Sequence, residues 1–141
     1  MLFRSYAEEY RWDVRFEAMV ARIVADFAQA NDPAREALWI AEVGGRRAGS
    51  VMCVDAGDGV AQLRLLLVEP SARGLGLGAR LVDECLRFAR RAGYTEMKLW
   101  TNSVLTAARR IYERSGFTLV EEERRDGLVP DQIFQTWARP L

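Results

Sequence analysis

The chain has 141 residues, the length of one ordinary domain, and half of it is apolar, so it can bury a sizeable core. Twenty basic residues balance twenty acidic ones, and this net charge of zero argues against a nonspecific binder of nucleic acid or of anionic membranes. The sequence contains no histidine. Its absence excludes Ser-His-Asp and Cys-His catalysis and every metal site that needs imidazole, and we expect no metal. Proton transfer then depends on Glu, Asp, Tyr, Cys, water or the backbone.

Cysteine content and the N-terminal sequence indicate the compartment. The two cysteines, Cys53 and Cys85, are too few for a zinc cage or a disulfide framework, and we expect both to be small buried hydrophobic residues. No apolar run is long enough to span a membrane, and the N-terminus lacks a signal-peptide pattern. Lys98 is the single lysine, which is typical of a GC-rich bacterial genome. We therefore expect a cytoplasmic, bacterial protein.

The first part of the chain predicts one helix and then three strands. An apolar stripe at helical spacing indicates a helix from about 13 to 29. Strands are expected at Leu38–Val43, Arg47–Val54 and Leu63–Val68, with a Gly-Gly turn between the first two. Because the connecting loops are short, these strands form an antiparallel meander.

The second part predicts helices alternating with strands. Apolar residues at helical spacing from Leu81 to Ala89 indicate a helix that ends at Gly93. The crossover that contains this helix is long enough to return parallel to the same sheet. The remaining elements are a strand at Met97–Thr101, a helix at about 104–115, and strands at Phe117–Glu123 and Ile133–Trp137. The sequence thus predicts one α/β or α+β domain, residues 1–141, with a mixed sheet of six or more strands and about three main helices.

A glycine-rich loop, Arg73-Gly74-Leu75-Gly76-Leu77-Gly78, precedes the helix of the crossover. Alternating glycines before a helix expose consecutive N–H groups at the positive end of the helix dipole, which suits a phosphate or pyrophosphate. The loop lacks the Gly-Lys-Ser/Thr of nucleoside triphosphate loops, and the G-x-G-x-x-G spacing of dinucleotide-binding folds is not met. A turn that only packs a strand against a helix is the alternative.

These residues resemble the GNAT superfamily of acyl-CoA N-acyltransferases. The family signature R/Q-x-x-G-x-G/A is met by Arg73, Gly76 and Gly78. A second segment, Ala108-x-x-x-Tyr112-x-x-x-Gly116-Phe117, is similar to the family's A-x-x-x-Y-x-x-x-G-F at its usual distance. Segments 10–17, 65–76 and 99–102 most resemble the acetyltransferase half of bacterial fusions with a MarR-type DNA-binding half, although no winged-helix half is present.

The resemblance implies acetyl-CoA as co-substrate and an N-acetyltransferase activity on a small-molecule or peptide amine. It assigns the pantetheine arm to the third strand and the pyrophosphate to the loop. It implies Tyr112 as the general acid, and packing under the sheet is the alternative for that residue. Glu69, at the end of the third strand, is our candidate base and Glu42 its rival, and a solvated surface carboxylate is the alternative for both. The implied cofactor-binding residues are Leu66, Leu67, Val68, Arg73, Gly74, Leu75, Gly76, Leu77, Gly78, Ala79, Asn102 and Ala108.

Several departures leave alternatives open. Many relatives have an asparagine where this chain has Leu105, with Asn102 the nearest asparagine, and the last predicted hairpin contains no histidine. The aromatic residues Trp12, Trp39 and Trp100 are candidates for an acceptor pocket or for the core. A non-catalytic acyl-CoA sensor and an interaction domain, dimeric through its C-terminal strands, are the other functions that the sequence permits. The acceptor itself is not identified.

Overall fold

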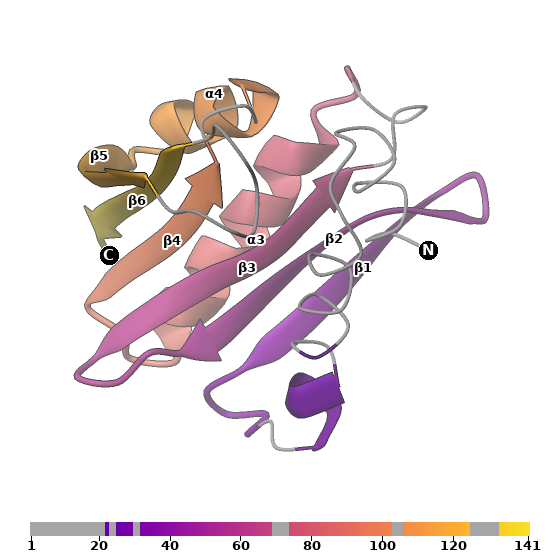
Figure 1. Cartoon of the computed structure of the whole chain (residues 1–141). Coiled ribbons are helices and arrows are strands. Elements are labelled where there is room, and N and C mark those ends of the chain that lie inside the picture. The colour runs from indigo at the N-terminus through magenta and orange to yellow at the C-terminus, as the bar shows by residue number, and fades with distance from the viewer. Residues whose placement is uncertain (1–21, 23–24, 30–31, 69–73, 103–105, 125–132) are drawn as a thin grey trace.

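A single mixed sheet of six strands is the centre of the molecule in a computed structural model that describes residues 22, 25–29, 32–68, 74–102, 106–124 and 133–141 (Figure 1). Residues 22 and 25–29 are helical, and the predicted helix over 13–29 lies otherwise outside the described residues. The strands are β1 (Ala37–Val43), β2 (Arg46–Asp55), β3 (Val60–Val68), β4 (Glu96–Asn102), β5 (Thr118–Arg124) and β6 (Ile133–Pro140). The two complete helices are α3 (Leu77–Arg91) and α4 (Thr106–Arg114).

The strand order β1-β2-β3-β4-β6-β5 confirms the predicted mixed sheet. The first three strands form the expected antiparallel meander, and β3 and β4 are parallel as the crossover through α3 predicts. The order of the last two strands was not predicted. β6 does not lie at the edge of the sheet beyond β5. It lies between β4 and β5 and pairs antiparallel with both.

The core lies between the sheet and α3. One face of α3, which carries Leu81, Val82, Cys85, Leu86 and Ala89, is buried, as its apolar spacing predicted. It packs against the sheet residues that point the same way, which are Val51, Cys53, Ala61, Leu63, Leu66, Met97 and Leu99. Both cysteines are free and buried in this core, as expected.

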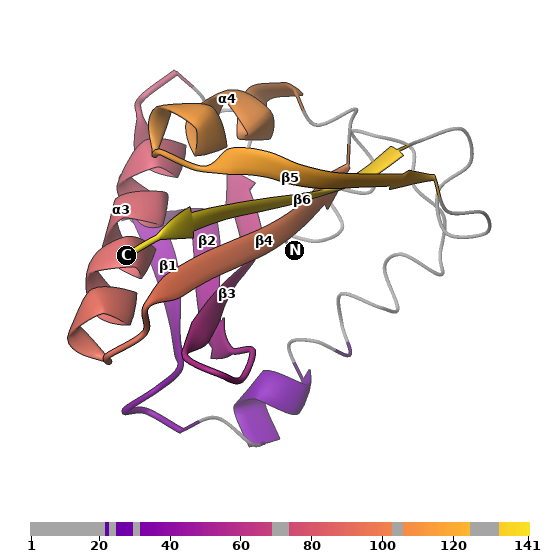
Figure 2. The same cartoon turned by 90° about the vertical axis from the view of Figure 1, so that its left-hand side faces the viewer.

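The second complete helix, α4, lies across the end of α3 where that helix begins (Figure 2). Tyr112 and Phe117 join the core from α4 and the residues after it, and Gly116 ends the helix with a left-handed φ of 89°. Arg139 of β6 donates from Nη1 to the carbonyl oxygen of Ser115 at 2.7 Å. This bond ties the last turn of α4 to the C-terminal strand.

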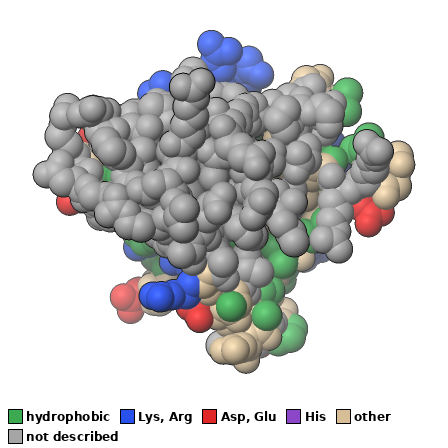
Figure 3. All heavy atoms as spheres, turned by 45° about the vertical axis from the view of Figure 1, so that its right-hand side comes forward, with side chains coloured by type: hydrophobic (Ala, Val, Ile, Leu, Met, Phe, Trp, Pro, Cys, Tyr) green, Lys and Arg blue, Asp and Glu red, His purple; other side chains and the backbone are tan. Residues whose placement is uncertain are grey.

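On the face that Figure 3 shows, the described residues present charged side chains of both signs. Apolar side chains also reach the surface at the edge strands, with Ile40 and Val43 on β1 and Leu119 and Val120 on β5 all exposed. Glu121, Glu122 and Glu123 lie exposed on the edge strand β5. Within the described residues, no helix has the length and apolar character needed to cross a membrane.

Candidate functional site

The parallel strands β3 and β4 pair along only part of their length. Their register runs from Val60 opposite Glu96 to Leu63 opposite Leu99. Beyond this point β3 continues with β2 on its other side, while β4 continues with β6. The sheet therefore opens from Arg64 onward, and the edge of β3 that faces β4 keeps peptide groups that can pair with an elongated ligand.

An irregularity in β3 accompanies this opening. Leu65 has a left-handed φ of 51°, and the β2–β3 register shifts between Ser50 and Met52. Such a bulge turns a strand and redirects its side chains. The Ser50 hydroxyl donates to the carbonyl oxygen of Leu65 at 2.9 Å and supports the unusual backbone there.

A close approach of two strands lies beside the bulge. A Cβ atom on Gly49 of β2 would stand 2.7 Å from the backbone oxygen of Leu67. Only glycine allows β2 to approach β3 this closely, because the obstructing atom belongs to the main chain. Gly49 therefore holds in place the part of β3 that the sequence assigns to pantetheine.

The predicted phosphate loop leads directly into α3. Gly74 and Gly76 have φ of 88° and 74°, and Gly76 is the N-cap of the helix. The cap makes no side-chain hydrogen bond, and the first turn carries no acidic residue. Its N–H groups and the positive end of a 15-residue helix are thus available to an anion. Leu75 is exposed in this turn, whereas Arg73 lies outside the described residues.

The third glycine of the loop has a different part in the structure. Gly78 lies inside the first turn of α3 and is buried. A Cβ atom there would come within 2.6 Å of Cδ1 of Ile111 on α4. The packing alternative for the glycines therefore applies to Gly78, while Gly74 and Gly76 shape the turn.

The side chain of Tyr112, on α4, is buried and packs edge-to-face against Phe117, with ring centroids 5.9 Å apart. Burial, and to a smaller extent the nearby Cys85, raise the pKa of the Tyr112 phenol above its ordinary value. The phenol therefore stays protonated through neutral pH and suits a proton donor better than a base. Ala108, one turn earlier on α4, is half-buried against the core.

Two buried polar atoms, one of them on β4 beyond the last pair with β3, were not predicted from the sequence. Oγ1 of Thr101 on β4 and Nε of Arg109 on α4 have no hydrogen-bond partner within the described structure. Thr101 lies two residues beyond Leu99, the last β4 residue that pairs with β3. A hydroxyl residue at a core-facing position of a central strand was the sequence signal for Thr101.

The remaining residues predicted for the cofactor site, the base and the acceptor pocket lie in different parts of the fold. Leu66 and Leu67 are buried and Val68 is half-buried on the open part of β3, while Leu77 and Ala79 begin α3. Asn102 ends β4, and its side chain is not described; Glu69 and Trp12 lie outside the described residues. Glu42 lies on β1, which β2 separates from the open part of β3. Trp39 packs on Phe88 of α3, whereas Trp100 is 49% exposed.

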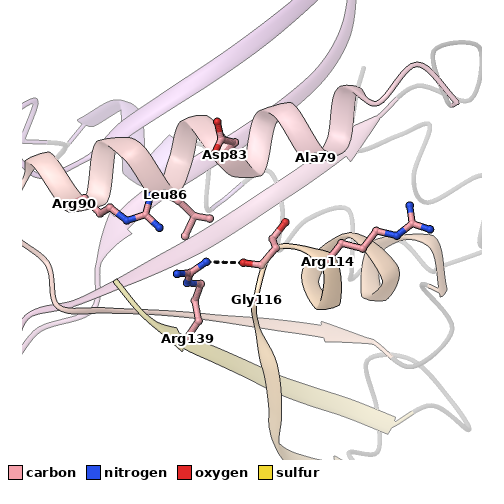
Figure 4. Close-up of a pocket in the computed structure, with 8 residues that line it drawn as sticks. Ala79, Asp83, Leu86, Arg90, Arg114, Gly116 and Arg139 are labelled. Atoms are coloured by element: carbon pink, nitrogen blue, oxygen red, sulfur yellow. Dashed lines mark hydrogen bonds between the residues drawn. The ribbon is translucent and has the colours of Figure 1, made fainter.

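A separate groove of about 410 Å³ runs along α3 beside the end of α4 (Figure 4). It is lined by Ala79, Asp83, Leu86, Arg90, Arg114, Ser115, Gly116 and Arg139. Arg90 and Arg114 occupy the last turns of their helices, where cations offset the negative end of the dipole. Arg139 binds the Ser115 carbonyl oxygen there. Helix ends thus account for these arginines without a ligand.

The opened parallel pair and an uncapped helix N-terminus are the two features that a ligand site could use here, the first through strand peptide groups and the second through helix N–H groups. Residues 1–117 match the model of the acetyltransferase (GNAT) family. The chain belongs to this family. The mixed α/β fold and the class of enzyme predicted from the sequence are thereby confirmed.

Individual relatives agree with this assignment. The chain is 30% identical to an uncharacterized N-acetyltransferase of Schizosaccharomyces pombe over 122 residues, which are 86% of this chain and 75% of that protein. Other curated relatives are matched over only 20 to 45% of their own length.

Solved structures show the same fold. An acetyltransferase from Streptococcus agalactiae superposes with a TM-score of 0.79 at 22% identity and covers 99% of this chain and 87% of its own. An acetyltransferase from Bacillus anthracis, solved in complex with acetyl coenzyme A, has a TM-score of 0.71 at 23% identity, covering 79% of this chain and 65% of its own.

Proposed function

We propose that this protein transfers the acetyl group of acetyl-CoA to a primary amine by direct attack. The observation that carries the proposal is the separation of β3 from β4 after Leu63, immediately before the uncapped N-terminus of α3. A strand edge and a helix N-terminus offer two kinds of donor in one site. Amide groups of an extended arm pair with the strand edge, and phosphate oxygens accept hydrogen bonds from the N–H groups of the helix N-terminus.

The cofactor-binding residues follow from this arrangement. Leu66 to Val68 would pair with the pantetheine arm, and Arg73 to Ala79 would bind the pyrophosphate. Gly74 and Gly76 already have the left-handed φ values that such a turn requires. Asn102 and Ala108 would complete the site from the end of β4 and from α4.

In the proposed reaction the neutral amine nitrogen attacks the thioester carbonyl carbon. A backbone N–H near Val68 would stabilise the oxyanion of the tetrahedral intermediate. When this intermediate collapses, the carbon–sulfur bond breaks and Tyr112 gives its proton to the leaving thiolate. The nitrogen loses its proton to Glu69, directly or through water, and Tyr112 regains a proton from solvent. The products are an N-acetylated amine and the free thiol of coenzyme A.

The pH dependence should report the amine. The chain has no histidine, and the raised pKa of Tyr112 keeps that phenol protonated, so deprotonation of the acceptor is the titration left near neutrality. We therefore expect kcat/KM to rise from neutral pH toward alkaline pH. A bell-shaped profile centred near pH 6.5 would contradict this mechanism.

Two measurements test the function. Calorimetry with acetyl-CoA, and with desulfo-coenzyme A as a control that lacks the reacting thiol, tests binding. A panel of primary amines with acetyl-CoA, followed by release of free thiol, tests transfer. Thiol release that depends on an amine supports the proposal. Binding without turnover would favour an acyl-CoA sensor, and no binding of coenzyme A would favour an interaction domain.

The cellular compartment and the kind of organism are part of the proposal. Two free buried cysteines and a single lysine suit a reducing cytoplasm in a bacterium. The segments similar to the acetyltransferase half of MarR-type fusions suggest a common ancestor with that group. We propose neither nucleic acid nor membrane as a partner, and residues 1–141 act as one acetyltransferase domain.

A further inference from the structure

The face of the sheet opposite α3 carries two cations and a tryptophan where β3 and β4 separate. Along β3, Ala61 and Leu63 belong to the core under α3, so Arg64 points to the opposite face. Along β4, Leu99 belongs to the core, and Lys98 and Trp100 alternate with it. The three polar or aromatic residues therefore share one face of the sheet.

Their position relative to the opening follows from the strand register. The last β3–β4 pair is Leu63 with Leu99, so Arg64 and Trp100 are the first residues on either side of the opening. Lys98 is two residues before Trp100, and its ammonium Nζ lies 5.2 Å from the centroid of the indole ring. This contact shows that the two side chains lie together on the face opposite α3.

The cluster of Arg64, Lys98 and Trp100 has an excess of positive charge. No described residue forms an ion pair or a side-chain hydrogen bond with Arg64 or Lys98, and both are half-buried. Arg87 on α3, in contrast, pairs with Asp83 at 3.1 Å. The neighbours of Lys98 and Trp100 on β6 are Ala138 and Thr136, which carry no charge.

A tryptophan exposed by 49% in a central strand is a second unusual feature. Trp39 and Trp137, the other described tryptophans, pack into or against the core. An exposed indole next to two cations that form no ion pair within the described residues offers a flat apolar surface beside anion-binding groups. Both features suit one molecule with an apolar part and an anionic group.

We infer that Arg64, Lys98 and Trp100 bind an acceptor that carries a carboxylate close to its amine, such as an amino acid. The inference rests on the proposed function, because it concerns the acceptor of the same site. The carboxylate would bind the cations and the side chain would cover Trp100. Nearby positive charge also lowers the pKa of an amine, so this cluster favours the neutral nucleophile that the reaction needs.

The test compares L-amino acids with their carboxamides, which keep the amine and side chain but lose the negative charge. The probes are glycine, L-alanine, L-leucine and L-phenylalanine with their amides, assayed by thiol release at saturating acetyl-CoA. We expect kcat/KM to favour the acids about tenfold, as a charge-assisted hydrogen bond implies. Equal rates, a preference for the amides, or acetylation of neither set would overturn the inference.

Variants assign the preference to the cluster. Arg64→Met and Lys98→Met keep most of the apolar side chain and remove the charge, and the double variant should bring the ratio of acid to amide close to one. Trp100→Leu should raise KM for leucine and phenylalanine more than for glycine. Arg91→Met, an exposed arginine at the far end of α3, is the matched control and should keep the ratio. An unchanged ratio in the double variant would also overturn the inference.

The two proposals fail in distinguishable ways. Affinity for acetyl-CoA, measured by calorimetry, should be the same in all five variants, because none of the four substituted residues lies in the loop or among Leu66 to Val68, the part of β3 proposed to pair with pantetheine. If the wild-type protein does not bind acetyl-CoA, the proposed function itself is wrong. If it binds acetyl-CoA and acetylates other amines without a preference for carboxylates, only the inference is wrong.

Discussion

The two ends of the central strand pair differ in how completely the backbone is satisfied. At the closed end, Thr95 N donates to the carbonyl oxygen of Gly59 at 2.8 Å, and Leu141 N donates to Thr95 at 2.9 Å. At the open end, β3 turns at Leu65 and leaves β4. One strand thus combines a hydrogen-bonded end with the edge proposed to bind the ligand. The proposed site therefore lies where the hydrogen-bond ladder between β3 and β4 ends, while β3 stays paired with β2 and β4 stays paired with β6.

Tyr112→Phe should have the largest effect, and it tests whether chemistry belongs to the open end. Loss of a general acid lowers kcat by about 100-fold or more, while KM for acetyl-CoA should hardly change because the ring remains. Tyr94→Phe, a buried tyrosine at the closed end, is the control and should keep kcat. Equal turnover by wild type and Tyr112→Phe, measured by thiol release, would rule out the proposed role.

Gly49→Ala should damage the open end through its packing. The new Cβ would meet the backbone oxygen of Leu67, which cannot move without displacing β3, so we expect a loss of about 2 kcal/mol in the free energy of unfolding. Gly78→Ala is the matched comparison. Its Cβ is obstructed by the end of the flexible Ile111 side chain and otherwise makes an ordinary contact with Val68, so the loss should be smaller. Urea unfolding measures both, and the reverse order would contradict this account.

Gly76→Asp should weaken acetyl-CoA binding through charge. Aspartate and asparagine both tolerate the left-handed φ of 74° and can cap α3, but only aspartate places a negative charge beside the proposed pyrophosphate. We expect Kd to rise about tenfold more for Gly76→Asp than for Gly76→Asn, the magnitude of one charge contact. Equal Kd values by calorimetry would show that the phosphate lies elsewhere.

Leu65→Gly and Leu65→Ala together measure the strain at the bulge. Both remove the leucine side chain, but only glycine adopts the φ of 51° without penalty. The glycine variant should therefore be more stable than the alanine variant by about 1 kcal/mol. If alanine is the more stable, as at ordinary strand positions, the bulge does not hold Leu65 in a strained conformation.

Alkaline titration should loosen the closed end and is the smallest effect. Tyr94 donates to the carbonyl oxygen of Arg35 at 2.7 Å, and burial followed by the nearby Asp55 raises its pKa to about 12. Below pH 10 the phenol is protonated in both states and contributes no pH dependence. Between pH 10 and 12 only the unfolded state releases the proton, so stability falls as the pH rises. Tyr94→Phe should reduce this slope in urea unfolding at pH 9 to 11.

Periodicity predicted most of the fold because each element has one buried face. The stripe on α3 from Leu81 to Ala89 and the alternation in β4 left little freedom in assigning these elements. The position of β6 could not be read in this way. Antiparallel pairing with β5 satisfies the pattern whether β6 lies outside β5 or between β5 and β4, and only the tertiary packing of Trp137 and Leu99 decides.

The turn before α3 could be predicted from the sequence, whereas the separation of β3 from β4 could not. The turn at Gly74 and Gly76 follows from the need for positive φ, which the spacing of glycines reveals. The bulge at Leu65 lies in a run of leucines, where a shift of one residue changes no polarity and leaves no signal. The sequence pattern around Trp100 was equally consistent with a position in the core. Its exposure depends on where β3 separates from β4.

The interior position of β6 has a consequence for the order of folding. Residues 133–140 are the last strand in sequence, yet they separate β4 from β5 and bond to both. During synthesis, β4 and β5 therefore leave the ribosome before the strand that joins them exists. Completing the sheet depends on contacts formed late between distant parts of the chain, which is the kind of topology that folds slowly.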